Sequence, residues 1–235
     1  MSNVAVIGAD RAVSVQSTAD VPLTADEVRV DVAYCGVCGS DLHLFFDTPE
    51  PMTGHVLGHE FSGTISELGS GVEGWSVGDN VVVLPIDECG ECLACRRADG
   101  TGVCVAGLTQ GPGLGRAGAL AESVVVPARM LFAVPDSLDL RTAALTEPLA
   151  VTLRGVWHSG AQAGDSVVVM GAGPIGLLAT QALHARGITD VLVVEPNPDR
   201  RQLAERFGVA ATAPDDLFAR AAQLAGPVRA VLDCT

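Results

Sequence analysis

The stretch from residue 166 to residue 233 constrains the fold of this chain more than any other part. An apolar run over 166–170 leads into Gly171-Ala172-Gly173-Pro174-Ile175-Gly176. Helical and strand patterns then alternate: helix 174–186, strand 190–194, helix 198–207, strand 209–212, helix 215–225 and strand 228–233. Strands that alternate with helices of this length form right-handed crossovers and a parallel sheet. The pattern predicts the first half of a doubly wound α/β sheet and the strand after it.

Three glycines mark the turn after the first of these strands as a dinucleotide site. Gly171 allows the tight turn, Gly173 lets a pyrophosphate approach the backbone, and Gly176 lets the helix pack on the strand. The helix that opens with Pro174 and Ile175 then presents backbone N–H groups to the phosphates. Because an apolar strand precedes this pattern and a helix follows it, the signal is specific.

The residues after the second strand bear on the choice between NAD and NADP. Glu195 lies nineteen residues after Gly176, where a carboxylate accepts hydrogen bonds from the adenosine ribose and repels a 2′-phosphate. We therefore predict NAD rather than NADP. Arg200 and Arg201 follow. They either lie on a solvated helix face, which we favour, or bind a 2′-phosphate.

The first 135 residues predict a β-rich part. Period-two alternation and apolar runs favour strands over 27–32, 61–68, 80–84 and 121–126, and helical spacing appears over 138–145 and 147–157. We place one domain at 1–150 and a second, dinucleotide-binding domain at 151–235.

Ligands suited to a catalytic Zn²⁺ occur in the β-rich part. Cys38 offers a thiolate and His59 an imidazole, and a catalytic zinc has three protein ligands and one open position. Glu147, at a helix start, is the preferred third ligand, and Glu60 beside His59 is the second candidate. Cys35 forms Cys-x-x-Cys with Cys38, but we expect it to pack as a small apolar residue rather than to form a redox pair.

Four further cysteines form a separate cluster over about 87–105: Cys89, Cys92, Cys95 and Cys104. Four thiolates at such spacing bind a closed, tetrahedral zinc, so the predicted role is structural.

These motifs, in this order, resemble the zinc-dependent medium-chain alcohol dehydrogenase family, with its polyol, butanediol and threonine dehydrogenase branch the most similar. Cys-Gly-Val-Cys-Gly-Ser-Asp-Leu-His, Gly-His-Glu, the cysteine cluster, Glu-Pro-Leu-Ala and Gly-Ala-Gly-Pro-Ile-Gly carry the resemblance along essentially the whole chain. It implies a GroES-like catalytic domain followed by a Rossmann domain that is C-terminally incomplete here. One departure is the spacing of eight residues between Cys95 and Cys104, where the family usually has seven.

The resemblance also implies roles for individual residues. Cys38 and His59 match zinc ligands, Glu147 matches the acidic third ligand of this branch, and Glu60 matches a glutamate beside the metal that can exchange onto it. Ser40 and His43 match a relay in which Ser40 accepts the proton of the alcohol and passes it, through the cofactor ribose, towards His43.

The function that follows is hydride transfer between a secondary alcohol or polyol, or its ketone, and NAD(H), with zinc at a catalytic and a structural site. The alternatives are a biosynthetic dehydrogenase of an amino-sugar or cyclitol-like alcohol that uses NAD(P), and an inactive zinc-binding fragment of such an enzyme.

Composition restricts the partners. The formal net charge is −14, which disfavours nucleic acid and anionic membranes. Every basic residue is Arg, so Schiff-base chemistry on Lys is excluded. No apolar run is long enough to span a bilayer and the N-terminus lacks the features of a secretory signal, so we expect a cytoplasmic protein with a small-molecule alcohol or ketone substrate. The resemblance implies a homodimer or homotetramer for the full-length form.

Overall fold

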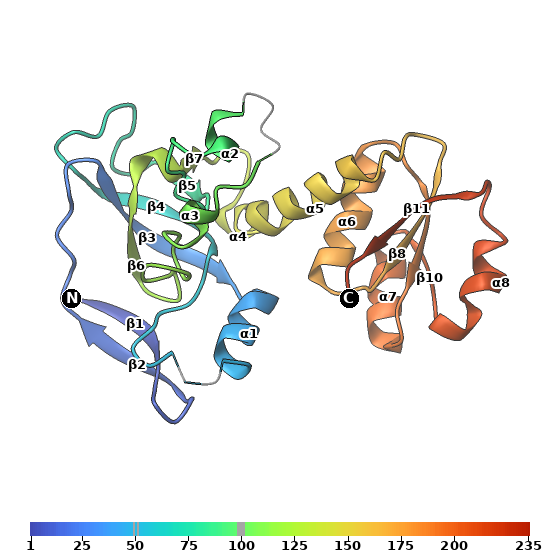
Figure 1. The fold of residues 1–235 in the computed structure, drawn as a ribbon, viewed down its shortest axis with the longest axis horizontal. Coiled ribbons are helices and arrows are strands. Elements are labelled where there is room, and N and C mark those ends of the chain that lie inside the picture. The colour runs from blue at the N-terminus through green and yellow to red at the C-terminus, as the bar shows by residue number, and fades with distance from the viewer. Residues whose placement is uncertain (49, 51, 98–101) are drawn as a thin grey trace. The chain divides into compact units, whose positions relative to one another are not determined.

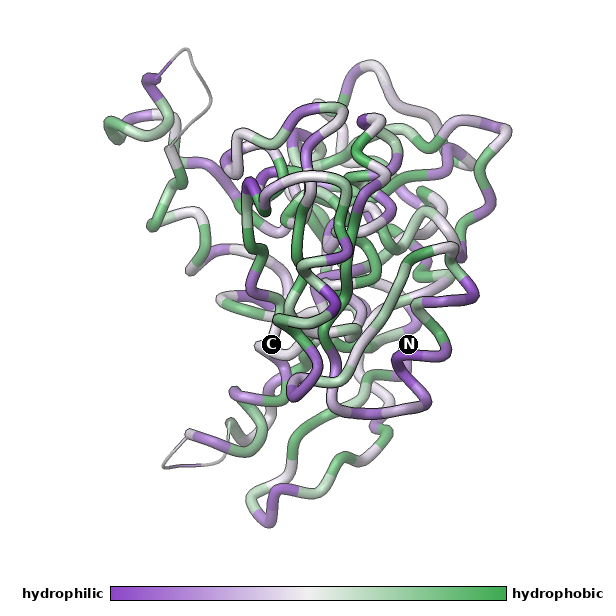
Figure 2. The backbone as a smooth tube through the Cα atoms, turned by 90° about the vertical axis from the view of Figure 1, so that its right-hand side faces the viewer, coloured by the Kyte–Doolittle hydropathy of each residue, from purple (hydrophilic) through white to green (hydrophobic). Residues whose placement is uncertain are grey.

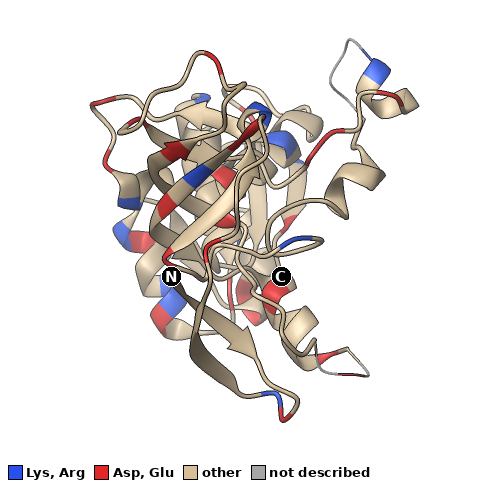
Figure 3. Ribbon diagram, turned by 90° about the vertical axis from the view of Figure 1, so that its left-hand side faces the viewer, with Lys and Arg blue, Asp and Glu red and all other residues tan. Residues whose placement is uncertain are grey.

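In a computed structural model that describes residues 1–48, 50, 52–97 and 102–235, the chain divides into two units, Met1–Glu147 and Pro148–Thr235 (Figure 1). The boundary predicted after residue 150 lies inside helix α5 (Thr146–His158). Acidic side chains, twice as numerous as basic ones, occur along the whole chain (Figure 3). None of the helices in the described ranges is long and apolar enough to cross a lipid bilayer.

The first unit is mostly antiparallel β-structure. Its elements are β1 (Ser2–Ile7), β2 (Val13–Thr18), β3 (Glu27–Gly36), α1 (Gly39–Phe46), β4 (Glu60–Leu68), β5 (Asn80–Val83), α2 (Leu93–Arg96), α3 (Val105–Leu108), β6 (Ser123–Pro127), η1 (Ala128–Met130), β7 (Leu131–Ala133) and α4 (Leu140–Ala143). Five strands form a sheet in the order β6-β3-β4-β5-β7, and β1 and β2 form a separate hairpin.

The core of this unit lies against the five-stranded sheet. Its buried members include Val28, Val30, Phe61, Ile65 and Val81. Val28 and Val30 occupy alternate positions of β3, which lie on the same face of the sheet. Val82, between Val81 and Val83 of β5, packs instead in a separate cluster with Ala143. The strands predicted over 27–32, 61–68, 80–84 and 121–126 are therefore confirmed, with shifts of a few residues at their ends, whereas the hairpin β1–β2 was not predicted. Every residue of β2 is exposed, so this strand carries little burial signal.

The second unit is a parallel sheet covered by helices. Its elements are β8 (Ser166–Met170), α6 (Pro174–Ala185), β9 (Asp190–Val194), α7 (Pro198–Arg206), β10 (Ala210–Thr212), η2 (Pro214–Asp216), α8 (Leu217–Ala221) and β11 (Val228–Asp233). The strand order is β10-β9-β8-β11, and all three pairings are parallel. This is the order of one half of a doubly wound sheet plus the next strand, as predicted. The helix predicted over 215–225 is shorter, because the segment starts as a 3₁₀ turn at Pro214 and α8 ends at Ala221.

Figure 2 colours the backbone by the hydropathy of each residue, and alternate residues of the apolar strands β8 and β9 belong to two different core clusters. Val167 and Val169 pack in the larger core with residues of α5, α6 and α7, such as Val156 and Leu183. Val168 packs on the other face with α8. Burial on both faces explains why these strands are continuously apolar rather than alternating.

Candidate active site

Pairing of β3 with β4 brings the proposed catalytic ligands together. In the register of this pair Gly36 lies opposite Glu60, so Cys38, two residues beyond Gly36, reaches His59 and Glu60. One ligand atom each of Cys38, His59 and Glu60 lie within 4.8 Å of one another. A Cβ atom on Gly36 would come within 2.4 Å of Glu60 Oε2, so a side chain at this position would displace the carboxylate from where it lies.

Asp41, for which the sequence predicted no role, contacts both Cys38 and His59 through its carboxylate. It is 1% exposed, its Oδ2 accepts a hydrogen bond of 2.9 Å from the N–H of Cys38, and its Oδ1 accepts one of 3.4 Å from Gly58. His59 Nδ1 lies 3.5 Å from Asp41 Oδ1 and makes no standard hydrogen bond among the described residues. A carboxylate behind a ligating imidazole orients the ring and raises its basicity. The signal in the sequence was an acid three residues after Cys38, at the start of a helix.

The electrostatics of the cluster favour a positive charge at its centre. Asp41 and Cys38 raise the pKa of His59 to about 10 against the opposing effect of burial. Burial, together with Asp41 and Glu60, raises the pKa of Cys35 to about 12, so this thiol stays protonated, which agrees with its expected role as a packing residue. A divalent cation supplies the positive charge that this group of donors favours, and thiolate, imidazole and carboxylate are ligands of zinc. The donor set therefore fits the metal.

The other sequence-predicted residues lie around this cluster. Glu147 is half-buried and lies outside the group within 4.8 Å. Burial raises the pKa of its carboxyl group, the charge of His59 lowers it and the charge of Glu60 raises it. Ser40 Oγ lies 3.4 Å from His59 Nε2. His43 is exposed on α1, where its Nδ1 lies 2.5 Å from Asp47 Oδ2.

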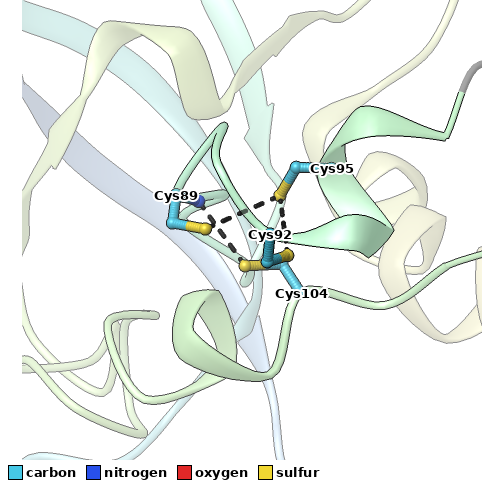
Figure 4. Close-up of side chains that lie close together, drawn as sticks. All are labelled: Cys89, Cys92, Cys95 and Cys104. Carbon is cyan, nitrogen blue, oxygen red and sulfur yellow. Dashed lines mark hydrogen bonds between the residues drawn. The ribbon is translucent and has the colours of Figure 1, made fainter.

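The second cysteine cluster also converges (Figure 4). The four sulfur atoms of Cys89, Cys92, Cys95 and Cys104 lie within 4.8 Å of one another, and all four cysteines are free. The Cys89–Cys95 and Cys92–Cys95 sulfur separations are 3.9 and 3.5 Å, too long for disulfides. The unusual spacing before Cys104 falls partly on residues 98–101, which lie outside the described residues.

The charges of this cluster likewise require a cation. Backbone N–H groups of Glu91 and Cys92 lower the pKa of Cys89 to about 6. Burial, followed by hydrogen bonds with the neighbouring cysteines, raises the pKa of Cys95 to about 12. A divalent metal stabilises the charge of thiolates and allows all four sulfurs to ionise, so the residues fit a closed structural zinc.

The glycine-rich turn has the geometry of a phosphate cradle. Gly171 has φ of +96°, and a Cβ on Gly176 would lie 2.1 Å from the carbonyl oxygen of Gly171, so both positions need glycine. A Cβ on Gly173 would meet nothing within 4 Å, which leaves the space in front of this residue open for a ligand. Gly173 is the N-cap of α6 and Pro174 its first residue, and Ile175 follows in the first turn.

The acidic and basic residues after β9 lie close to this turn. Glu195 is buried, and its carboxylate accepts the N–H groups of Ala172 and Asn197 at 2.8 Å each. Arg201 donates to the carbonyl groups of Glu195 and Pro196. Arg200 is exposed, which is compatible both with a solvated helix face and with contact to a 2′-phosphate.

An antiparallel unit with two groups of candidate metal ligands and a parallel unit with a glycine-rich dinucleotide turn are the architecture expected of the zinc-binding dehydrogenase class. The alcohol dehydrogenase GroES-like domain matches residues 24–136 and the zinc-binding dehydrogenase domain matches residues 174–235. The chain belongs to the zinc-dependent medium-chain alcohol dehydrogenase family, whose members are oxidoreductases, and the predicted GroES-like and Rossmann folds are confirmed.

Comparisons with known proteins illustrate this membership. The chain is 41% identical over 200 residues to 2-dehydro-3-deoxy-L-galactonate 5-dehydrogenase of Pseudoalteromonas atlantica, covering 82% of this chain and 56% of that protein. It is 41% identical over 216 residues to (R,R)-butanediol dehydrogenase of Bacillus subtilis, covering 85% and 60%. The crystal structure of the Bacillus subtilis 2R,3R-butanediol dehydrogenase superposes with a TM-score of 0.84, at 35% identity, over 100% of this chain and 71% of that one.

An alcohol dehydrogenase of Escherichia coli CFT073, complexed with NADH, superposes with a TM-score of 0.86 at 28% identity, over 100% of this chain and 69% of that one. The chain thus spans 56% and 60% of the length of the two curated relatives named above.

Proposed function

We propose that this chain is part of a zinc-dependent oxidoreductase that transfers a hydride between a secondary alcohol or polyol, or the corresponding ketone, and NAD(H). The observation that carries the proposal is the convergence of Cys38, His59 and Glu60 within 4.8 Å. A dinucleotide turn on the same chain makes hydride transfer the reaction that combines the two sites.

Cys38 and His59 are the proposed ligands of the catalytic zinc, with Glu147 or Glu60 as the third. Bound zinc supplies a Lewis acid for the alcohol oxygen, and NAD supplies a hydride acceptor. The position of Glu60 in the 4.8 Å group supports it as the third ligand. The electrostatic interaction of Glu147 with His59 and Glu60, which changes the pKa of Glu147, supports the alternative.

Ser40 is the proposed proton acceptor of the substrate hydroxyl. Its Oγ lies 3.4 Å from the ring nitrogen Nε2 of His59, so it borders the ligand cluster. His43 lies three residues later on the exposed side of α1, where an imidazole can exchange a proton with solvent. Its contact with Asp47 orients the ring and supports this role.

Glycines 171, 173 and 176 and the start of α6 are the proposed site of the NAD pyrophosphate, and Glu195 favours NAD over NADP. The relatives named for butanediol and for a deoxy-galactonate suggest a small secondary alcohol or its ketone as the substrate. The homo-oligomer and the cytoplasmic location stay predictions, and light scattering tests the first of them.

The test combines metal analysis, cofactor binding and turnover. We expect two zinc ions per chain, tighter binding of NADH than of NADPH, and NADH formation from 2,3-butanediol, sorbitol or L-threonine in the protein that contains this chain. Removal of zinc with a chelator should abolish the NADH formation, and added zinc should restore it. Turnover that persists at its full rate without zinc would refute the proposal.

A further inference from the structure

The carboxylate of Glu195 binds the protein backbone through both of its oxygens. Oε2 accepts a hydrogen bond of 2.8 Å from the N–H of Ala172, and Oε1 accepts one of 2.8 Å from the N–H of Asn197. The residue is only 4% exposed. Glu195 thus connects the glycine-rich turn after β8 with the loop that caps α7.

The backbone of Glu195 is held as firmly as its side chain. Its N–H donates to the carbonyl of Thr212 in β10 at 3.0 Å, and its carbonyl accepts a hydrogen bond of 2.7 Å from Arg201 Nη1. Because the backbone N–H and C=O groups of Glu195 both bond to residues of regular elements, the position of its carboxylate relative to the turn is restricted.

Two consecutive N–H groups of the turn donate hydrogen bonds to the last residue of β9 and to the residue after it. Gly171 donates to the carbonyl of Val194 at 2.7 Å, and Ala172 donates to Glu195. Ala172 is 1% exposed and immediately precedes Gly173, the N-cap of α6. The orientation of the Ala172 peptide therefore sets where the open space at Gly173 and the first turn of α6 face.

The carboxylate is kept in its charged form, the one that accepts both hydrogen bonds. Burial alone raises its pKa, but the N–H groups of Ala172 and Asn197, followed by the charges of Arg200 and Arg201, lower it on balance. An ionised acceptor makes stronger hydrogen bonds to backbone N–H groups than a neutral one.

We propose that Glu195 is a positioning residue that holds the glycine-rich turn in the shape that receives the diphosphate of a nucleotide. This inference rests on the proposed dinucleotide site but assigns Glu195 a task that is independent of the ribose. The amide of a Gln side chain has one oxygen, so one backbone N–H would lose its acceptor and face an N–H₂ group instead. Affinity for the diphosphate should then fall even when the ribose has no hydroxyl groups.

A nucleotide with ribose hydroxyl groups and one without them distinguish ribose binding by Glu195 from its positioning of the glycine-rich turn. Calorimetric titrations compare ADP with 2′,3′-dideoxy-ADP on the wild-type chain, on Glu195→Gln and on the control Glu205→Gln, which removes the same charge from an exposed position of α7. We expect Glu195→Gln to weaken the binding of both nucleotides by about tenfold, the effect of losing one charge-assisted hydrogen bond. Glu205→Gln should bind both as the wild type does.

Equal binding of dideoxy-ADP by the wild type and Glu195→Gln would overturn the inference, because Glu195 would then act through the ribose alone. Hydrogen exchange of the Ala172 amide in the wild-type chain gives a second test that needs no variant: slow exchange is expected, and exchange at the rate of an unprotected amide would overturn the inference. A wild-type chain that binds neither ADP nor NADH would refute the proposed function, whereas the exchange rate of Ala172 would still decide the task of Glu195.

Discussion

Replacement of Asp41 by Asn should weaken zinc binding at Cys38 and His59 and leave the four-cysteine cluster loaded. The Asp41 carboxylate faces three donors, the N–H groups of Cys38 at 2.9 Å and Gly58 at 3.4 Å and the His59 ring at 3.5 Å. Asn keeps one oxygen and turns an N–H₂ group towards the remaining donors. The imidazole then loses the carboxylate that orients it.

The expected losses in stability and in zinc affinity follow from the burial of Asp41 and from the number of its contacts. A hydrogen bond to a buried charged group contributes about 1.5–3 kcal/mol, and two of the three contacts are long, so the free energy of unfolding should fall by about 2 kcal/mol. Loss of a carboxylate behind a ligating histidine lowers metal affinity about 10–100-fold.

The assay measures zinc per chain after dialysis against graded concentrations of a chelator. We expect Asp41→Asn to lose one of its two zinc ions at about 10–100-fold lower chelator concentration than the wild type. Asp136→Asn, at an exposed position, is the matched control and should behave as the wild type. If Asp41→Asn keeps both ions with wild-type affinity, the assigned role of Asp41 is wrong.

Three further predictions concern the other parts of the chain. Cys104→Ser should leave one zinc per chain and lower Tm by about 10 °C in a thermal scan, because the closed site stabilises its lobe; an unchanged Tm would contradict this. Gly176→Ala should lower the free energy of unfolding by about 2–4 kcal/mol in a denaturant titration and weaken NADH binding, because its Cβ would lie 2.1 Å from Gly171 O. The control is Gly155→Ala, whose Cβ would meet nothing within 4 Å. It should leave the free energy of unfolding unchanged or raise it by up to about 1 kcal/mol. The folded pKa of Glu195 lies below its ordinary value of 4.5, so its stabilisation is present above pH 4.5 and is lost as pH falls through the folded pKa. The Tm difference between wild type and Glu195→Gln should therefore shrink as pH falls below 4.5, and a difference that grows on acidification would contradict this sign.

Local signals were enough to predict the parallel sheet. Its strands are buried on both faces and therefore continuously apolar, and its helices begin at recognisable caps such as Gly173-Pro174 and Asn197-Pro198. The same reasoning failed for the hairpin β1–β2, because every residue of β2 is exposed and burial is what imposes an apolar period.

The sequence by itself determined which residue types could bind metal and where the diphosphate turn lies, since thiolates, imidazoles and glycines at short spacing carry that information locally. Only the tertiary structure decided that Glu60 lies in the 4.8 Å group with Cys38 and His59 while Glu147 does not, that Asp41 supports the histidine, and that Glu195 holds Ala172. These contacts depend on the register of β3 on β4 and on the pairing of β8 with β9, which join residues distant along the chain. A register shift of one residue would turn each side chain to the opposite face of its sheet, so no local pattern could specify them.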